Sequence, residues 1–212
     1  DLLLTRGPLD VLDHSSDRFS MGGKLGIDAT VKLSEERTDE YHSVPLLLLT
    51  GEQFTEEVIT GMKTMADYAL PLAVLTIRKP EEGLDMHRLA ASLPASLTTP
   101  GTVVIAVDDG ADADDPSMLT WLVTGNSDPA RDLYHLEGGA IFIDATSKTH
   151  SLPVFPREWP NVVCSAPETI ELVNSRWTEY GIGPFIESPS LKLLPLVRPG
   201  EASVETAKTT AG

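Results

Sequence analysis

The chain has 212 residues, 41% of them hydrophobic, and its 32 acidic residues against 16 basic ones give a formal net charge of −16. This length and hydrophobic share suit one globular domain of ordinary size or slightly more. The negative charge repels phosphate backbones and anionic lipids, so nucleic-acid binding and membrane-surface roles are disfavoured.

The cysteine count and the hydropathy of the sequence indicate in which cellular compartment the protein is expected. The single Cys164 cannot form an intramolecular disulfide or a four-cysteine zinc site. This favours a reducing compartment, and we expect a cytoplasmic location. No apolar run approaches the roughly 20 residues that span a bilayer, so stable membrane insertion is not expected. The chain opens with DLLL, which resembles the middle of a strand, and we interpret it as a fragment of a longer protein.

From residue 44 onward, short apolar runs alternate with longer periodic segments. The runs VPLLLL (44–49) and LAVLTI (72–77) predict strands buried on both faces. Between them, apolar residues at helical spacing predict a helix over 53–68. A second helix is expected near 84–92.

The alternation continues through the middle of the chain. We expect a strand at 102–107, a helix at 116–124 and a strand at 133–136. Four strand runs separated by three helices predict an α/β fold of the order βαβαβαβ. The sheet is expected to be mainly parallel, with helices on both faces.

The last quarter of the chain has a different texture. The proline-rich stretch PVFPREWPNVV (153–163) should form an ordered surface loop. A C-terminal helix is expected next, because Ser165 and Glu168 have capping-box spacing and Gly181 would end it. The small, polar residues 198–212 predict a flexible tail.

One pattern, Gly-Gly-x-(Leu/Ile)-x-Ile-Asp-Ala-Thr-x-Lys, occurs twice, in MGGKLGIDATVKL (21–33) and EGGAIFIDATSKT (137–149). The glycines of GGKLG, in the first copy, are interpreted as a tight turn rather than a phosphate-binding loop. A lysine accompanies the aspartate of each copy: Lys24 or Lys32 with Asp28, and Lys148 with Asp144. These contacts could stabilise the turn or line a ligand cleft, and the turn-stabilising interpretation is favoured.

Other candidate chemistry is weak. The acidic run DDGADADD (108–115) could hold Ca²⁺ or Mg²⁺, but its spacing is not that of an EF-hand, and charge at a helix N-terminus explains it equally well. The histidines are scattered, and there is no nucleophile elbow, Walker loop or dinucleotide fingerprint. The tryptophans Trp121, Trp159 and Trp177 are expected to pack in the core. We therefore assign no catalytic, cofactor-binding or metal-binding residue.

The motifs together resemble a known family. Its features are matched by PLDVLDHSSDRFSMGGKLGIDATVKL (8–33) and then, in order, by VVIAVDDGADADD, a helix with Trp121, DPARDL (128–133), IDATSK (143–148) and PREWP (156–160). These segments resemble the C-terminal part of the UbiD-type decarboxylases, prenylated-flavin-dependent carboxy-lyases that include polyprenyl-hydroxybenzoate decarboxylase.

The resemblance also implies a tandem duplication. Residues 1–43 resemble the end of a first C-terminal unit, with DLLL (1–4) corresponding to DLYHL (132–136). Residues 44–197 resemble a complete second unit, which lacks the PLDVLDHSS loop. If the first copy of the repeat keeps a cleft-facing role, we expect the second to keep only the fold.

The family's chemistry lies elsewhere in its members. The resemblance implies that prenylated FMN, a divalent metal and K⁺ bind in an upstream domain, where a Glu-Arg-Glu set supplies acid–base catalysis. None of those motifs occurs here. The resemblance thus implies a non-catalytic fragment whose parent decarboxylates an aromatic or unsaturated acid, in ubiquinone or menaquinone biosynthesis.

The expected partners are the upstream catalytic domain and further copies of the chain. The resemblance implies oligomer contacts near the final helix, with Trp177 and Tyr180 as candidates, and closure of the substrate cleft. Two alternatives remain open. The chain could be an independent flavin- or nucleotide-binding module that uses the loops after Thr50 and Val107, or its second copy could be a scaffold relic.

Overall fold

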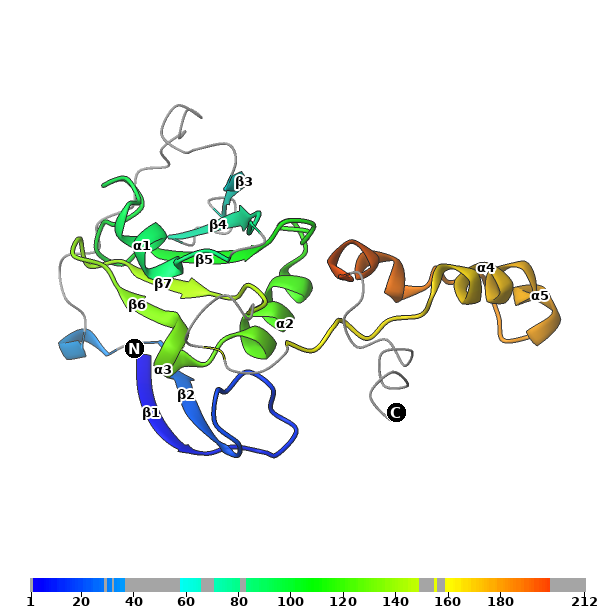
Figure 1. The fold of residues 1–212 in the computed structure, drawn as a ribbon, viewed down its shortest axis with the longest axis horizontal. Coiled ribbons are helices and arrows are strands. Elements are labelled where there is room, and N and C mark those ends of the chain that lie inside the picture. The colour runs from blue at the N-terminus through cyan, green and yellow to red at the C-terminus, as the bar shows by residue number, and fades with distance from the viewer. Residues whose placement is uncertain are drawn as a thin grey trace, which may run out of the picture. The chain divides into compact units, whose positions relative to one another are not determined.

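The computed structural model describes residues 2–28, 30–31, 33–36, 58–65, 71–80, 83–148, 155 and 159–198 (Figure 1). The chain divides into two compact units. The larger unit comprises residues 1–109 and 113–159, and the smaller comprises residues 110–112 and 160–212.

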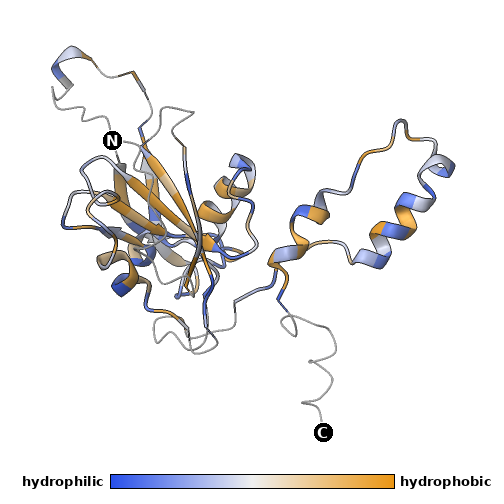
Figure 2. Ribbon diagram, turned by 90° about the horizontal axis from the view of Figure 1, so that it is seen from above, coloured by the Kyte–Doolittle hydropathy of each residue, from blue (hydrophilic) through white to orange (hydrophobic). Residues whose placement is uncertain are grey.

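A five-stranded sheet forms the body of the larger unit. Its strands are β3 (Ile59–Thr64), β4 (Leu72–Ile77), β5 (Val103–Asp108), β6 (Leu133–His135) and β7 (Ile141–Asp144). Their order in the sheet is β3-β4-β5-β7-β6. The central strands β4 and β5 are largely buried, and Figure 2 shows the strands of this sheet as mostly hydrophobic. The expected strands at 72–77, 102–107 and 133–136 are confirmed.

Short helices accompany this sheet. They are α1 (Met86–Ala91), α2 (Pro116–Asn126) and α3 (Pro129–Asp132), which confirms the helices expected near 84–92 and 116–124. An aspartate side chain caps the start of each one, and in α2 and α3 a proline follows the cap, where its missing N–H costs nothing. Met86 and Ala90 of α1 join the core on one face of the sheet. Val74 and Val107 point to the other face and are also buried.

The sheet is mixed, so the expectation of a mainly parallel sheet is wrong. Strand β5 pairs in parallel with β4 and β7, but β3 pairs antiparallel with β4, and β6 pairs antiparallel with β7. A turn through Gly139, at φ 89°, joins β6 to β7. Such a short connection can only return the chain antiparallel, because a parallel crossover needs a dozen or more residues.

The helix expected over 53–68 is also wrong where the structure describes it. Residues Ile59–Thr64 form β3, which pairs with β4 through a register shift near Gly61. The apolar spacing fitted a helix, but ITG combines two β-branched residues with a glycine, a poor helix-forming sequence. The expected strand at 44–49 lies outside the described residues.

The first described residues form a separate two-stranded sheet in the larger unit. Strands β1 (Leu2–Pro8) and β2 (Met21–Ile27) pair antiparallel over their whole length, with Leu4 opposite Leu25. The strand expected at the opening DLLL is therefore confirmed. A short 3₁₀ helix, η1 (Ser34–Glu36), follows.

The smaller unit contains the C-terminal helix predicted from the sequence. It is divided into α4 (Pro167–Ser175) and α5 (Trp177–Tyr180), and Gly181 ends it in the left-handed conformation, at φ 62°. Two 3₁₀ turns, η4 (Pro189–Lys192) and η5 (Leu194–Leu196), follow. The predicted capping box is wrong, because Ala166 is the N-cap residue and no side chain caps the helix. The predicted tail lies outside the described residues apart from Arg198.

Candidate functional site

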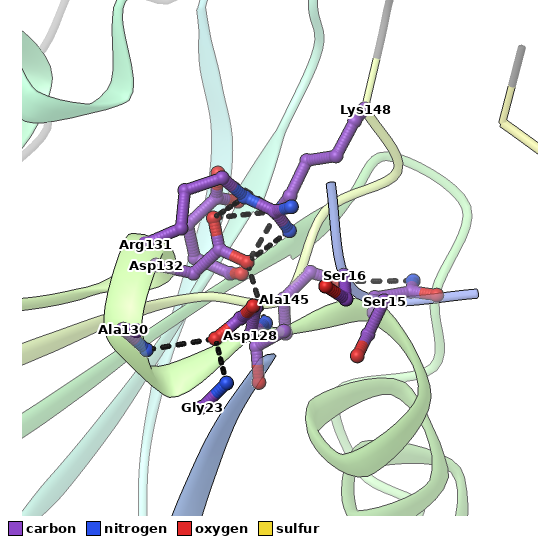
Figure 3. Close-up of polar contacts among 12 residues, drawn as sticks. Ser15, Ser16, Gly23, Asp128, Ala130, Arg131, Asp132, Ala145 and Lys148 are labelled. Carbon is purple, nitrogen blue, oxygen red and sulfur yellow. Dashed lines mark hydrogen bonds and ion pairs between the residues drawn. The ribbon is translucent and has the colours of Figure 1, made fainter. Parts of the chain in front are cut away.

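Charged side chains from two of the family-like motifs converge at one place, where one of them, Asp128, accepts a hydrogen bond from Gly23 of β2 (Figure 3). We call this group the motif cluster. Its charged members are Asp128, Arg131 and Asp132 from DPARDL, and Asp144 and Lys148 from IDATSK. The aspartates and the lysine are each at most 3% exposed. Buried charges are stable only when they are paired and hydrogen-bonded, so the contacts of each one matter.

Lys148 is the centre of the cluster. Its Nζ lies 3.0 Å from the carboxylate of Asp144 and 3.5 Å from that of Asp132. It also donates hydrogen bonds to the carbonyls of Asp144, at 3.0 Å, and Thr146, at 2.9 Å. All of these partners are acceptors, so the ammonium group is fully used for binding within the protein.

The Asp144 carboxylate also organises its own turn. Its Oδ1 accepts from the backbone N–H of Thr146 at 3.0 Å and from the Thr146 hydroxyl. Burial alone would raise the pKa of Asp144, but Lys148, Lys79 and the Thr146 bonds outweigh it and hold that pKa below its usual value. Asp144 is therefore a stable buried anion.

Asp132 has a less favourable setting. Arg131 donates from Nε to its Oδ1 at 2.8 Å, and its second oxygen accepts from the Asp128 backbone N–H at 2.8 Å. Burial nevertheless raises the pKa of Asp132, and Lys148 and Arg131 offset only part of that effect. The two carboxylates that share Lys148 are thus shifted in opposite directions.

Asp128 connects the cluster to the hairpin. Its Oδ1 caps α3 by accepting from Ala130 N–H at 2.9 Å, and it accepts from Gly23 N–H at 2.8 Å. A Cβ on Gly23 would lie 2.4 Å from this oxygen, and one on Gly22 would lie 3.0 Å from the other carboxylate oxygen. The interpretation of these glycines as a tight turn is wrong, because they lie in β2 and permit the close approach of Asp128.

Aromatic rings cover the cationic side of the cluster. Phe155 lies under the Arg131 guanidinium at 5.0 Å, and the Trp159 ring lies 5.9 Å from Lys148 Nζ. His14, from the PLDVLDHSS loop, meets Trp159 edge to face at 5.1 Å. Residues from the first and second repeat regions therefore meet at one place.

The predicted site residues have different fates. Asp144 and Lys148 lie together in the motif cluster, whereas Lys24 and Asp28 are exposed on and after β2. Asp28 accepts hydrogen bonds from the N–H and hydroxyl of Thr30. Lys32 lies outside the described residues. Sequence reasoning missed Asp128 and Asp132, although a second Asp-Pro dipeptide was a signal of a capped helix.

The candidate interface residues lie in the smaller unit. Trp177 is half-buried, donates from its ring N–H to the Gly183 carbonyl at 3.1 Å, and packs against Phe185. Tyr180 is exposed and lies beside Arg176. The core prediction holds for Trp159, but it is wrong for Trp121, which is 46% exposed.

Several carboxylates of the acidic run 108–115, which begins at the last residue of β5, make contacts within the protein. Asp108 accepts from Ser147 N–H at 2.7 Å, Asp109 pairs with Arg78, and Asp115 caps α2. Asp114 pairs with Lys63. Across the described ranges, no group of three or more His, Cys, Asp or Glu residues is placed to hold a metal. In the same residues, no helix is long and apolar enough to cross a bilayer.

Comparisons with known proteins agree with the motifs. An uncharacterized protein of Helicobacter pylori strain 26695 is 30% identical over 169 residues, which cover 80% of this chain and 27% of that protein. One of Archaeoglobus fulgidus is 30% identical over 124 residues, 51% of this chain and 26% of that protein. The chain thus spans about a quarter of the length of these relatives.

Two solved structures are among those similar to this chain. The UbiD-class enzyme HmfF from Pelotomaculum thermopropionicum, in complex with prFMN, is 21% identical, with 56% of this chain and 26% of that chain covered and a TM-score of 0.38. Vanillic acid decarboxylase from Sedimentibacter hydroxybenzoicus is 20% identical, with 58% and 29% covered and a TM-score of 0.40.

The family model of the 3-octaprenyl-4-hydroxybenzoate carboxy-lyase C-terminal domain, UbiD_C, matches residues 42–154. This range holds the five-stranded sheet and all the charged residues of the motif cluster, and it is more than half of the chain. The chain therefore belongs to the UbiD family, through its C-terminal carboxy-lyase domain.

Proposed function

We propose that this chain is a non-catalytic C-terminal part of a UbiD-family carboxy-lyase that acts as a longer polypeptide. The observation that carries the proposal is the closed state of the motif cluster. Its carboxylates are buried, and its lysine contacts only groups of the protein. A general acid or base must reach a substrate atom, and these groups do not. The cluster stabilises the domain instead of performing acid–base chemistry.

The flavin cofactor of the family is assigned to another domain on the same reasoning. A flavin phosphate needs free cations or backbone N–H groups. Lys148 and Arg131 are committed to buried carboxylates, and the residues after Val107 are acidic. Neither the motif cluster nor this loop therefore supplies a phosphate site for such a cofactor. The same acidity disfavours an independent nucleotide-binding module at that loop, while the loop after Thr50 lies outside the described residues.

Oligomer contacts and closure of the substrate cleft are the proposed contribution of the chain. The smaller unit supports this role because its described residues expose several large hydrophobic side chains, which in a soluble protein mark contact surfaces. They include Leu172, Tyr180, Ile182, Phe185 and Ile186. The parent reaction is decarboxylation of an aromatic or unsaturated acid.

Activity measurements on two proteins test the proposal. The full-length polypeptide, supplied with prenylated FMN, a divalent metal and K⁺, should release CO₂ from an aromatic or unsaturated acid, and the 212-residue chain should not. Release of CO₂ by the 212-residue chain alone would contradict it. Sedimentation of the full-length protein should show an oligomer that Phe185→Asp weakens and Trp121→Asp leaves intact.

We also propose that the chain carries a tandem duplication. The support is a shared register in two hairpins. In the first, Leu2 lies opposite Ile27, and in the second, Leu133 lies opposite Ile143, which are the corresponding residues of the repeat. The sequence that precedes Asp1 in the parent tests this, because a tryptophan helix and an Asp/Glu-Pro-x-Arg ending are expected there.

A further inference from the structure

The hairpin of β1 and β2 exposes far more apolar surface than the sheet of the same unit. Among the described residues, four large hydrophobic side chains are exposed on the two strands of the hairpin, and none is exposed on the strands of the five-stranded sheet. Leu3 and Ile27 are each 67% exposed. They occupy opposite faces of the ribbon, because cross-strand partners share a face and Leu3 pairs with Gly26. A two-stranded ribbon with apolar residues on both faces is marginal by itself.

Hydrogen bonding shows which edge of β2 is open. Gly23 donates its N–H to Asp128 and not to Arg6, its partner on β1. Bonded and non-bonded pairs alternate in an antiparallel ladder, so the N–H groups of Leu25 and Ile27 point to the same outer edge. Within the described residues, β2 has no strand on that edge, since its sheet contains β1 and β2 only.

The second hairpin, formed by β6 and β7, shows which kind of strand pairs with such an edge. Strand β7, the counterpart of β2 in the repeat, pairs on its outer edge with β5 in parallel. Ile141, the counterpart of Leu25, donates its N–H to Thr102, and Ala145 donates to Ala106. In the register of β5, Val103 lies opposite Ile141 and Ile105 opposite Ile143.

From this equivalence we infer that the outer edge of β2, from Leu25 to Ile27, binds a parallel, apolar strand from another part of the same longer polypeptide. The inference rests on the proposed function, which places this chain in a longer protein. The relatives are long enough to contain such a strand outside the matched region, because this chain matches only about a quarter of their length. A second copy of this chain is disfavoured as the occupant, since its described apolar parallel strand, β5, is already paired with β4 and β7 in its own sheet.

The amide groups of Leu25 and Ile27 provide the direct test. We expect their hydrogen exchange to be at least about tenfold slower in the full-length polypeptide than in the 212-residue chain, because pairing protects edge amides. Equal exchange in the two proteins would overturn the inference. So would slow exchange in the 212-residue chain that requires high concentration, because a second copy would then cover the edge.

Two proline variants separate edge pairing from damage to the hairpin. Leu25→Pro removes an N–H that β1 does not use, so it should speed exchange across β2 in the full-length polypeptide and leave the 212-residue chain unchanged. Gly26→Pro removes an N–H directed at β1 and should speed exchange in both proteins. Equal effects of Leu25→Pro in both proteins would overturn the inference. Decarboxylation by the full-length polypeptide is measured separately, so a failed strand and a failed function are distinguishable.

Discussion

The two hairpins built from the repeat share their local structure and differ in their surroundings. In both, the aspartate of the Asp-Ala-Thr sequence accepts from the N–H and hydroxyl of the threonine two residues later. Asp28 and Thr30 are exposed, whereas Asp144 and Thr146 are buried. The same tripeptide thus forms a surface turn in one place and the anchor of a charge network in the other.

The difference shows that the sequence pattern specifies the turn but not how much the turn contributes to the stability of the fold. Hydrogen bonds of an exposed turn replace bonds to water and add little. The same bonds in a buried turn cannot be replaced by water, so removing one group leaves its partner unsatisfied. Matched substitutions in the two copies measure this difference directly.

The largest effect is expected from Lys148→Met. Removing the ammonium leaves the buried carboxylates of Asp144 and Asp132 without their shared cation, which should destabilise the fold by about 3–5 kcal/mol. Urea unfolding monitored by circular dichroism measures this change. The control Lys24→Met, on exposed β2, should stay within about 0.5 kcal/mol. Equal decreases in the free energy of unfolding for the two variants would mean that the motif cluster does not stabilise the fold more than an exposed lysine does.

Asp144→Asn should follow, with a loss of about 2–3 kcal/mol at neutral pH, because it removes charge-assisted bonds to Lys148 and Thr146. The pKa of Asp144 is lowered in the folded state, so its contribution is present above the unfolded value of about 4 and disappears as pH falls through the lower folded value. The variant should lose this acid-range part of the pH dependence.

Unfolding midpoints measured between neutral and acidic pH test this linkage. Asp28→Asn is the matched control, since it alters the same turn at an exposed position, and it should leave the acid range of the curve nearly unchanged. A wild-type curve that is superimposable on that of Asp144→Asn would contradict the assignment of Asp144 as a buried anion.

Gly23→Ala should cost about 1–3 kcal/mol, because the added Cβ would lie 2.4 Å from Asp128 Oδ1 and 2.5 Å from the backbone nitrogen of Ala130. Gly26→Ala in the same strand is the control, since its Cβ would meet Leu3 at 3.5 Å, an ordinary contact. Thermal unfolding of both variants should show a lower midpoint for the first only. A matching decrease in both would point to strand propensity instead of the Asp128 contact.

The smallest effect is expected from the threonines of the two turns. Thr146→Val removes a buried hydroxyl that donates to Asp144 and should cost about 1 kcal/mol. Thr30→Val removes the same bond, 2.6 Å long, at an exposed turn and should change stability by less than about 0.5 kcal/mol. Chemical unfolding of the pair gives the difference, and a larger loss for Thr30→Val would reverse the comparison.

Local patterns predicted much of the fold. The strands at β4 and β5 and the helices α1 and α2 have apolar periodicity or capping residues that act within a few positions. The strand β3 was missed because its apolar spacing fitted a helix, and its pairing with β4 outweighed that signal. The antiparallel pairing of β6 with β7 was missed because it depends on the short turn after β6.

The site was predictable only in part for a similar reason. The four-residue spacing of Asp144 and Lys148 made their contact foreseeable. Nothing in the local sequence indicates that Asp132 shares the same lysine, or that Gly23 lies against Asp128. These contacts depend on long-range packing, and a glycine chosen for close approach looks the same in sequence as one chosen for a turn.

The hydrogen bond from Gly23 to Asp128 also bears on the order of folding. It joins residues 105 positions apart in the chain, so its formation closes a long loop at an entropic cost. The Asp128 oxygen that accepts this bond also caps α3, a contact between residues only two positions apart, which can form earlier. We therefore expect the hairpin to dock late, onto a sheet that is already assembled, with the repeat's first Gly-Gly pair reporting the last step of assembly.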